Sequence, residues 1–247
     1  MTDRRGIARV VLRVRDAGTV GAFYRDAIGL HPMGAGRFGD GSSVLVELID
    51  DPAATPRDPQ AAGLFHTAIL LPDRADLGAW GTHAARSGLQ LTGASDHGVS
   101  EAIYLNDPEG NGIEIYRDRP AAEWIRDGDR VEMFTRRLDL TDLARAAHGD
   151  WVGVPRGTVV GHVHLQVGDL PAAAGFMTGD LGLTRTFAAG GGEWFGWDGY
   201  HHHLAVNTWN SAGAGPRDAR MAGLERIVLN GVAIDAQDPW GTRFSGE

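Results

Sequence analysis

The 247-residue chain contains no cysteine. Disulfide bonds, thiolate nucleophiles and zinc–thiolate sites are therefore excluded. Basic residues are also scarce, with 23 Lys and Arg against 32 Asp and Glu and a formal net charge of −9. Because no cluster of Lys or Arg interrupts this acidic balance, nucleic acids and anionic membrane surfaces are disfavoured as partners.

Long apolar runs are missing as well. The sequence has no stretch of about 18 apolar residues, the length that a membrane-spanning helix needs. Its first ten residues, MTDRRGIARV, lack the apolar core and the small-residue cleavage site of a signal peptide. A cytoplasmic protein is therefore expected. The 43% of apolar and 22% of charged residues are typical of a folded globular chain.

An internal repeat is present. Residues 7–30, IARVVLRVRDAGTVGAFYRDAIGL, align without a gap with residues 160–183, VGHVHLQVGDLPAAAGFMTGDLGL. In the first copy Val10, Leu12 and Val14 alternate as in a half-buried strand, and a turn containing Asp then leads into a helical pattern. Each copy therefore predicts a strand, a turn and a short helix that ends at Gly-Leu.

Two further segments follow the same order of elements. Residues 66–118 predict a strand, a helix and two strands joined by a Gly-rich turn. The segments PRDARMAGLERIVL and DPWGTRF, near the C-terminus, match PRDPQAAGLFHTAI and DPEGNGI, and only residues 230–237 separate them, too few for a helix of usual length. The sequence therefore predicts an α+β fold of four βαβββ modules, the fourth shortened.

Four such modules with a DPEGNGIEIY ending resemble the vicinal-oxygen-chelate superfamily of glyoxalase I, bleomycin- and fosfomycin-resistance proteins and extradiol dioxygenases. Within it, LFHTAILLP, ASDHGVSEAIYLNDPEGNGIEIYRDRP, GHVHLQVGDL and GYHHHLAVNTW resemble the two-domain catechol-2,3-dioxygenase branch. The resemblance implies open mixed β-barrels in two domains, with modules one and two at residues 1–118, a connector at 119–157, and modules three and four at 158–247.

Two histidines and one glutamate are candidate ligands of a metal ion. A non-haem Fe(II) that binds substrate and oxygen together is held by two His and one carboxylate on one face. Glu114 lies between two isoleucines, where an acid is costly unless it is paired, exposed or bound to a metal. His66 begins the first strand of the same module, and His162 stands where the first repeat has Arg9. The predicted ligands are therefore His66, Glu114 and His162.

Modules one and four lack these ligands, because Arg226 replaces the first histidine in module four and Arg9 the one in module one. The metal is therefore expected in a barrel built by modules two and three. A ligand set drawn only from residues 1–118 would depend on Glu47, since arginine does not ligate a cation. His164 lies on the same strand face as His162 and is a competing ligand or substrate contact.

The resemblance also implies residues that handle protons and oxygen. His97 and Tyr104 fall at the spacing of the extradiol dioxygenase signature that ends at Glu114, although Ser95 departs from the residues the signature prefers. In that family an acid/base histidine precedes a short apolar strand, and His202 in HHHLAVNTW is the best match. An imidazole titrates near neutrality, which suits proton transfer. In a regular strand the flanking histidines 201 and 203 face away from His202, and a solvated edge and a functional place stay equally open for them.

Three functions are compatible with these features. The leading hypothesis is an Fe(II) extradiol ring-cleaving dioxygenase, a metalloenzyme of the catechol 2,3-dioxygenase type, in which both diol oxygens chelate the metal and O2 is the second substrate. The second is an isomerase, lyase or transferase of the same superfamily that uses Mn(II) or another divalent metal. The third is a metal-free drug-binding resistance protein, which would need none of the three ligands. A homo-oligomer is compatible with each.

Overall fold

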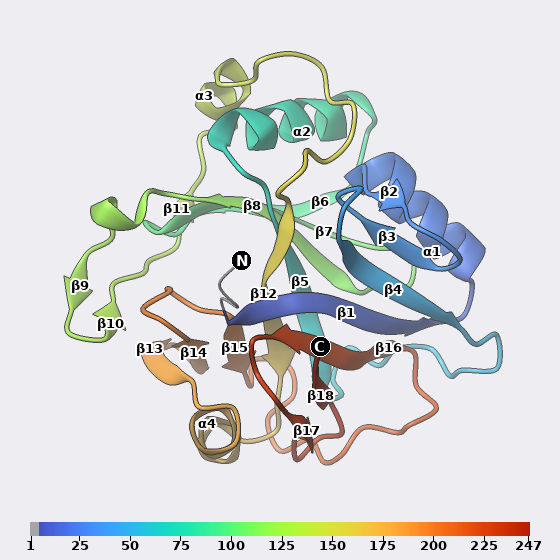
Figure 1. Ribbon diagram of the computed structural model, residues 1–247, viewed down its shortest axis with the longest axis vertical. Helices are drawn as coiled ribbons and strands as arrows, with labels where there is room; N and C mark the ends of the chain where they lie inside the picture. Colours follow the sequence, from blue (N-terminus) through green and yellow to red (C-terminus); the bar gives the residue numbers. More distant parts are fainter. Residues whose placement is uncertain (1–4) are drawn as a thin grey trace.

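The computed structural model describes residues 5–247 and confirms the α+β fold of four modules, with the fourth shortened (Figure 1). Module one contains β1 (Gly6–Val14), α1 (Ala17–Phe23), the π-helical turn η1 (Tyr24–Ile28), β2 (His31–Pro32), β3 (Arg37–Gly39) and β4 (Val44–Asp50). Module two contains β5 (Gly63–Leu70), α2 (Arg74–Arg86), β6 (Leu91–Asp96), β7 (Ser100–Asn106) and β8 (Gly112–Asp118).

The connector holds only short elements. It contains the 3-10 turn η2 (Ala121–Glu123), β9 (Arg126–Asp127), β10 (Arg130–Val131), β11 (Arg136–Arg137) and α3 (Leu140–Arg145). Module three contains β12 (Val159–Gln166), α4 (Leu170–Gly179), β13 (Thr184–Ala189), β14 (Gly192–Gly196) and β15 (Leu204–Asn207). Module four contains β16 (Gly223–Asn230), β17 (Asp235–Gln237) and β18 (Arg243–Gly246), with no helix after its first strand.

The modules pair across the connector to form two curved sheets. The larger sheet has the order β11-β6-β7-β8-β5-β12-β15-β14-β13 and joins modules two and three; we name it the 2/3 half-barrel. The other has the order β17-β18-β16-β1-β4-β3-β2 and joins modules one and four, so we name it the 1/4 half-barrel. Each sheet thus takes one module from residues 1–118 and one from 158–247. The division of the chain into two domains at these boundaries stays a prediction.

The repeated sequence pattern accounts for the repeated elements. Val10, Leu12 and Val14 of β1 are fully buried, as their alternation predicts. An aspartate then begins each helix, since the side chains of Asp16, Asp73 and Asp169 accept hydrogen bonds from backbone N–H groups in the first turns of α1, α2 and α4. Module four has no such helix, in agreement with the short segment, residues 230–237, that separates its two repeat-like pieces.

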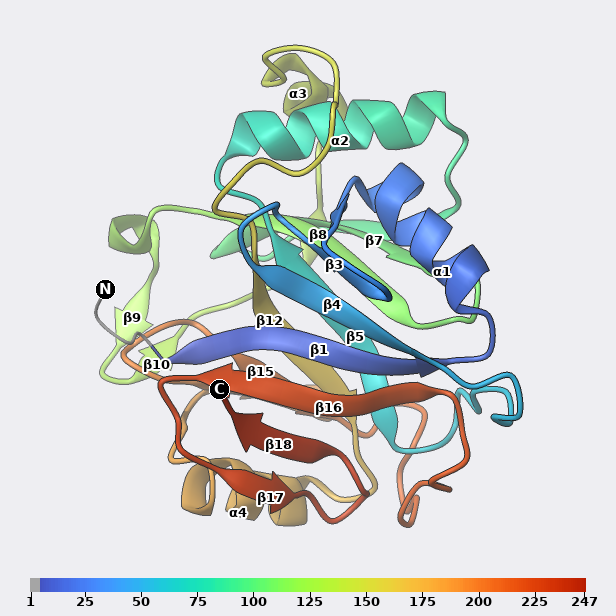
Figure 2. The same ribbon diagram turned by 45° about the vertical axis from the view of Figure 1, so that its right-hand side comes forward.

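One hydrophobic cluster draws on all four modules, so the two half-barrels share a core. Figures 1 and 2 both show α2 and α3 on one side of the molecule and α4 on the opposite side, with the strands between them. The first strands β1 and β12 also approach each other across the two sheets. Within residues 5–247, none of the helices is long and apolar enough to cross a membrane.

The first strand of every module carries a bulge at the equivalent place. The pairing of β5 with β12 skips Phe65 and Gly161, and the pairing of β1 with β16 skips Ala8 and Glu225. A bulge reverses the alternation of side chains beyond it. As a result, Phe65 and His66 both line the cavity described below, although they are neighbours in one strand.

Candidate active site

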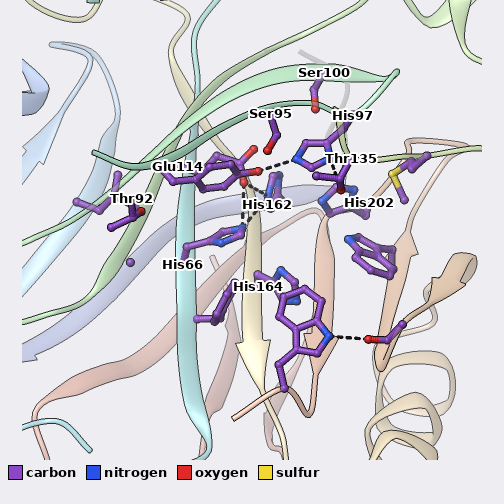
Figure 3. Close-up of a pocket in the computed structure, with 18 of the residues that line it drawn as sticks. His66, Thr92, Ser95, His97, Ser100, Glu114, Thr135, His162, His164 and His202 are labelled. Carbon is purple, nitrogen blue, oxygen red and sulfur yellow. Dashed lines mark hydrogen bonds and ion pairs between the residues drawn. The ribbon is translucent and has the colours of Figure 1, made fainter. Parts of the chain in front are cut away.

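The three predicted ligands lie on adjacent strands at the centre of the 2/3 half-barrel. His66 is on β5 and His162 on β12, the two central antiparallel strands, and Glu114 is on β8, which runs parallel to β5. All three side chains are buried. Figure 3 shows them pointing toward one another from these strands.

Two glycines allow this close approach. A side chain at Gly112 would overlap the backbone carbonyl of Phe65, so β8 could not lie against β5 beside His66. A side chain at Gly161 would overlap the hydroxyl of Tyr116, which fills the space next to His162. Both positions therefore need glycine because of backbone and ring packing around the ligand residues.

The geometry of the three ligand atoms fits a metal ion. The Nε2 atoms of His66 and His162 are 3.3 Å apart, and Glu114 Oε2 lies 3.0 Å from the first and 3.2 Å from the second. Ligands at right angles and about 2.1 Å from a common ion lie about 3.0 Å apart. Two imidazole nitrogens and one carboxylate oxygen therefore converge as a facial set, and they can hold a divalent cation.

The electrostatics of the group agree with a site for a cation. Burial alone would raise the pKa of Glu114, but His162 and His66 hold it well below its ordinary value. Burial lowers the pKa of His162, although Glu114 opposes this shift. The carboxylate is thus ionised while the imidazole favours its neutral, ligating form.

His164 lines the same cavity as His162 but is not one of the three residues whose ligand atoms converge, and its role as a competing ligand or a substrate contact stays a prediction. His164 is buried, but its Nε2 lies 3.0 Å from the side-chain amide of Asn207, which donates to it. Trp209 N–H donates to the amide oxygen of Asn207 and so fixes the orientation of this amide.

Tyr104 and His97 form a hydrogen-bonded pair beside the ligands. The Tyr104 hydroxyl lies 2.7 Å from His97 Nε2, and His97 Nδ1 lies 2.9 Å from the carbonyl oxygen of Phe134. Because a carbonyl only accepts, His97 Nδ1 donates, and in a neutral ring Nε2 accepts the Tyr104 proton. Burial, and then Glu114, raise the pKa of Tyr104 well above its ordinary value, so it remains a phenol.

His202 lines the same cavity and packs against His162, with the ring centroids 4.2 Å apart. Burial, and then the neighbouring histidines, lower its pKa well below the ordinary value. Residues 201–203 are not part of a regular strand, because β15 begins only at Leu204. His201 and His203 are buried, so a solvated edge is excluded for both.

The three predicted ligands line a cavity of about 730 Å³ that is rich in aromatic side chains. Its aromatic lining includes Phe65, Phe134, Phe187, Trp194 and Trp209. None of the described residues that line it is Lys or Arg. Connector residues 133–135 also line it, which no sequence pattern indicates, because the connector is polar and has no clear periodicity.

The chain is similar in sequence to known dioxygenases. The sequence profile of the Glyoxalase/Bleomycin resistance protein/Dioxygenase superfamily matches residues 6–115. Catechol-2,3-dioxygenase from Bacillus subtilis (strain 168) is 38% identical over 195 residues, which cover 77% of this chain and 68% of that protein. Biphenyl-2,3-diol 1,2-dioxygenase 2 from Rhodococcus globerulus is 35% identical over 74 residues, 30% of this chain and 39% of that protein.

Solved structures show the same fold. A glyoxalase I mutant from Zea mays superimposes with a TM-score of 0.58 at 13% identity, over 98% of this chain and 94% of that chain. At this identity the likeness concerns the fold alone. It supports the arrangement of the four modules and carries no argument about the reaction.

Proposed function

The chain belongs to the Glyoxalase/Bleomycin resistance protein/Dioxygenase superfamily, and from this premise we propose that it is an Fe(II)-dependent extradiol dioxygenase that opens the ring of a catechol. The observation that carries the proposal is the facial set of His66, Glu114 and His162 in a cavity that also holds His202 and the Tyr104–His97 pair. The names of the two dioxygenase relatives support the same reaction class.

Three protein ligands leave the opposite face of a six-coordinate ion open. His66, Glu114 and His162 would hold Fe(II), which when bound would supply a common binding place for the diol oxygens and O2. Mn(II) is the alternative metal, since the same donor set accepts it. Two histidines with one carboxylate balance only one of the two positive charges, so the site favours an anionic substrate atom such as a catecholate oxygen.

The surrounding residues have separate roles in this proposal. His202 takes a proton from a diol hydroxyl and later returns it, as the acid/base. Tyr104 keeps its proton and its place through His97, and its hydroxyl lies where it can meet an oxygen atom of the reactants. The buried position of the ligands keeps bulk water away from the reacting atoms.

The cavity favours neutral catechols with an apolar substituent. Trp194, Trp209 and Phe187 offer aromatic surface, and the described lining holds no Lys or Arg side chain that could pair with a substrate carboxylate. We expect the ratio kcat/KM to favour an aryl- or alkyl-substituted catechol over a carboxylated one by at least about tenfold. This ratio needs only about 1.4 kcal/mol, less than an unpaired buried carboxylate costs.

Oxygen consumption and product colour test the reaction. Protein loaded anaerobically with Fe(II) and then mixed in air with a panel of catechols should consume O2 and substrate one to one. Ring opening beside the diol gives a conjugated semialdehyde, so the solution should turn yellow. Neither signal from any catechol, with the iron still bound and reduced, would reject the dioxygenase in favour of an isomerase, lyase or transferase. The cytoplasmic location and homo-oligomer expected from the sequence remain proposals.

A further inference from the structure

A chain of three side chains leads away from the cavity behind His202. His202 Nδ1 lies 2.7 Å from His201 Nδ1, and His201 Nε2 lies 2.9 Å from Asp118 Oδ1. We propose that His201 is a positioning residue, which keeps the His202 proton on Nδ1 and leaves Nε2 as the bare nitrogen that faces the cavity. This inference rests on the proposed acid/base function of His202.

The direction of these hydrogen bonds begins at Asp118. An ionised carboxylate only accepts, so the proton between Asp118 and His201 belongs to His201 Nε2. The hydroxyl of Tyr200 donates to the other oxygen of Asp118 at 2.7 Å, so this bond leaves Oδ1 to His201. Asp118 is the last residue of β8, the strand that carries Glu114.

The tautomer of His202 then follows. A neutral imidazole carries one proton, so a neutral His201 protonated on Nε2 presents a bare Nδ1. The hydrogen bond between the two Nδ1 atoms therefore uses a proton of His202 Nδ1. His202 Nε2 is left without a proton, which is the form that a base needs at that atom.

Packing holds this arrangement. The His201 ring is completely buried, with Tyr200 against it at 4.1 Å between ring centroids and Trp124 at 4.9 Å. Turning the His201 ring over would remove both nitrogens from their partners. In water a neutral histidine carries its proton mainly on Nε2, so His202 needs a fixed acceptor at Nδ1 to keep the reverse form.

Nitrogen NMR measures the tautomer without turnover. We would record the ring-nitrogen shifts of the 15N-histidine-labelled full chain, loaded with diamagnetic Zn(II), at pH 8. The expected result for His202 is a protonated Nδ1 and an unprotonated Nε2. A protonated Nε2 on His202 in the unsubstituted protein would overturn the inference, and this measurement needs no variant.

Substitutions separate positioning from packing. His201→Phe keeps a ring but removes the acceptor, and it should shift the His202 proton to Nε2 with the metal content unchanged. His201→Asn places an amide oxygen near the position of Nδ1 and should restore the original tautomer. Tyr200→Phe, the matched control, removes one hydrogen bond to Asp118 and should leave the tautomer unchanged. An identical His202 tautomer in His201→Phe and the unsubstituted protein would also overturn the inference.

Kinetics of the Fe(II)-loaded protein give the second measurement. His201→Phe should lower kcat roughly 10- to 100-fold with KM nearly unchanged, a smaller loss than the roughly 10²- to 10⁴-fold of a missing acid or base. His201→Asn should recover most of kcat. If the protein cleaves no catechol but His202 has the expected tautomer, the proposed function fails while the positioning by His201 stands. An unchanged kcat in His201→Phe rejects the positioning role.

Discussion

The two half-barrels share the order of their central strands but differ in the side chains at their centres. In the 2/3 half-barrel Glu114 of β8 pairs with Ala68, two residues after His66. Ala205 of β15 likewise pairs with His164, two residues after His162. The corresponding positions of the 1/4 half-barrel hold Arg226 with Ser245 and Arg9 with Glu47. A bulge directly precedes each of the four equivalent residues on the first strands, which are His66, His162, Arg9 and Arg226.

The two half-barrels share a backbone arrangement, so a few side chains at equivalent positions account for the difference between their centres. Arg9 lies 3.5 Å from Glu47 and 2.5 Å from Glu247, so charges at the centre of the 1/4 half-barrel neutralise one another. In the 2/3 half-barrel three lone-pair donors point at one place instead. The strands and bulges supply the frame in both, but the residues after the bulges differ: His66 and His162 in one half-barrel, Arg226 and Arg9 in the other.

The largest expected effect comes from truncating the side chain at one equivalent position in each half-barrel. His162→Ala should remove a ligand and lower metal affinity by more than the roughly 10- to 100-fold that loss of an outer partner costs. Arg9→Ala, at the equivalent position, should leave the metal content unchanged. Metal analysis after anaerobic purification measures both. Loss of metal in Arg9→Ala with retention in His162→Ala would reverse the assignment of the half-barrels.

A second substitution adds a ligand instead of removing one. Ala205 is buried, and its place in module three is equivalent to that of Glu114 in module two. It pairs with Trp194, which lines the cavity. Ala205→Glu should place a carboxylate on the open face, retain the metal and lower oxygen uptake more than about 10²-fold, because catalytic sites need an open position. Ser245→Glu is the control in the 1/4 half-barrel and should bind no metal there. Normal turnover of Ala205→Glu would contradict an open face at this position.

Turnover can also be lost without loss of the metal. His202→Phe should keep one metal ion per chain and lower kcat by roughly 10² to 10⁴, the range for a general acid or base. Metal content and oxygen uptake measured on the same sample separate the two effects. A metal-free His202→Phe protein would identify His202 as a ligand.

The smallest effects should be equal in the two half-barrels. Asp16→Ala and Asp169→Ala each remove the side chain that caps a helix, α1 in one half-barrel and α4 in the other. Each should lower the free energy of unfolding by about 1 kcal/mol, measured by urea denaturation, with the metal content unchanged. A loss of metal in Asp169→Ala would show that the frame and the ligands are coupled more tightly than the repeated structure implies.

The sequence predicted the modules well because each is a local repeat. Strand alternation and the Asp-capped turns are written in consecutive residues, and the structure confirms them. The apolar surroundings of Glu114, the place of His66 on a first strand and the comparison of repeats at His162 singled out three residues, which the fold brings together from three strands. Their role as metal ligands, like the roles of His97, Tyr104 and His202, stays a prediction.

Other features depend on contacts between distant segments. The bulge at Phe65 arises from pairing between β5 and β12, and nothing in the local pattern marks it. The place of His201 was missed because residues 198–203 form an irregular turn, in which Asp198 and Gly199 have positive φ angles of 53° and 73°. A turn of this kind lets consecutive side chains lie on one side, which a regular strand does not allow.

The pairing of modules across the connector has a consequence for biosynthesis. When a ribosome has released residues 1–118, β1 and β5 are both complete, but their partners β16 and β12 have not been made. Each nascent sheet therefore ends in an unpaired apolar strand, which can associate with other chains. Only the later half of the polypeptide covers these edges, so the speed of translation and the presence of chaperones bear directly on the yield of folded protein.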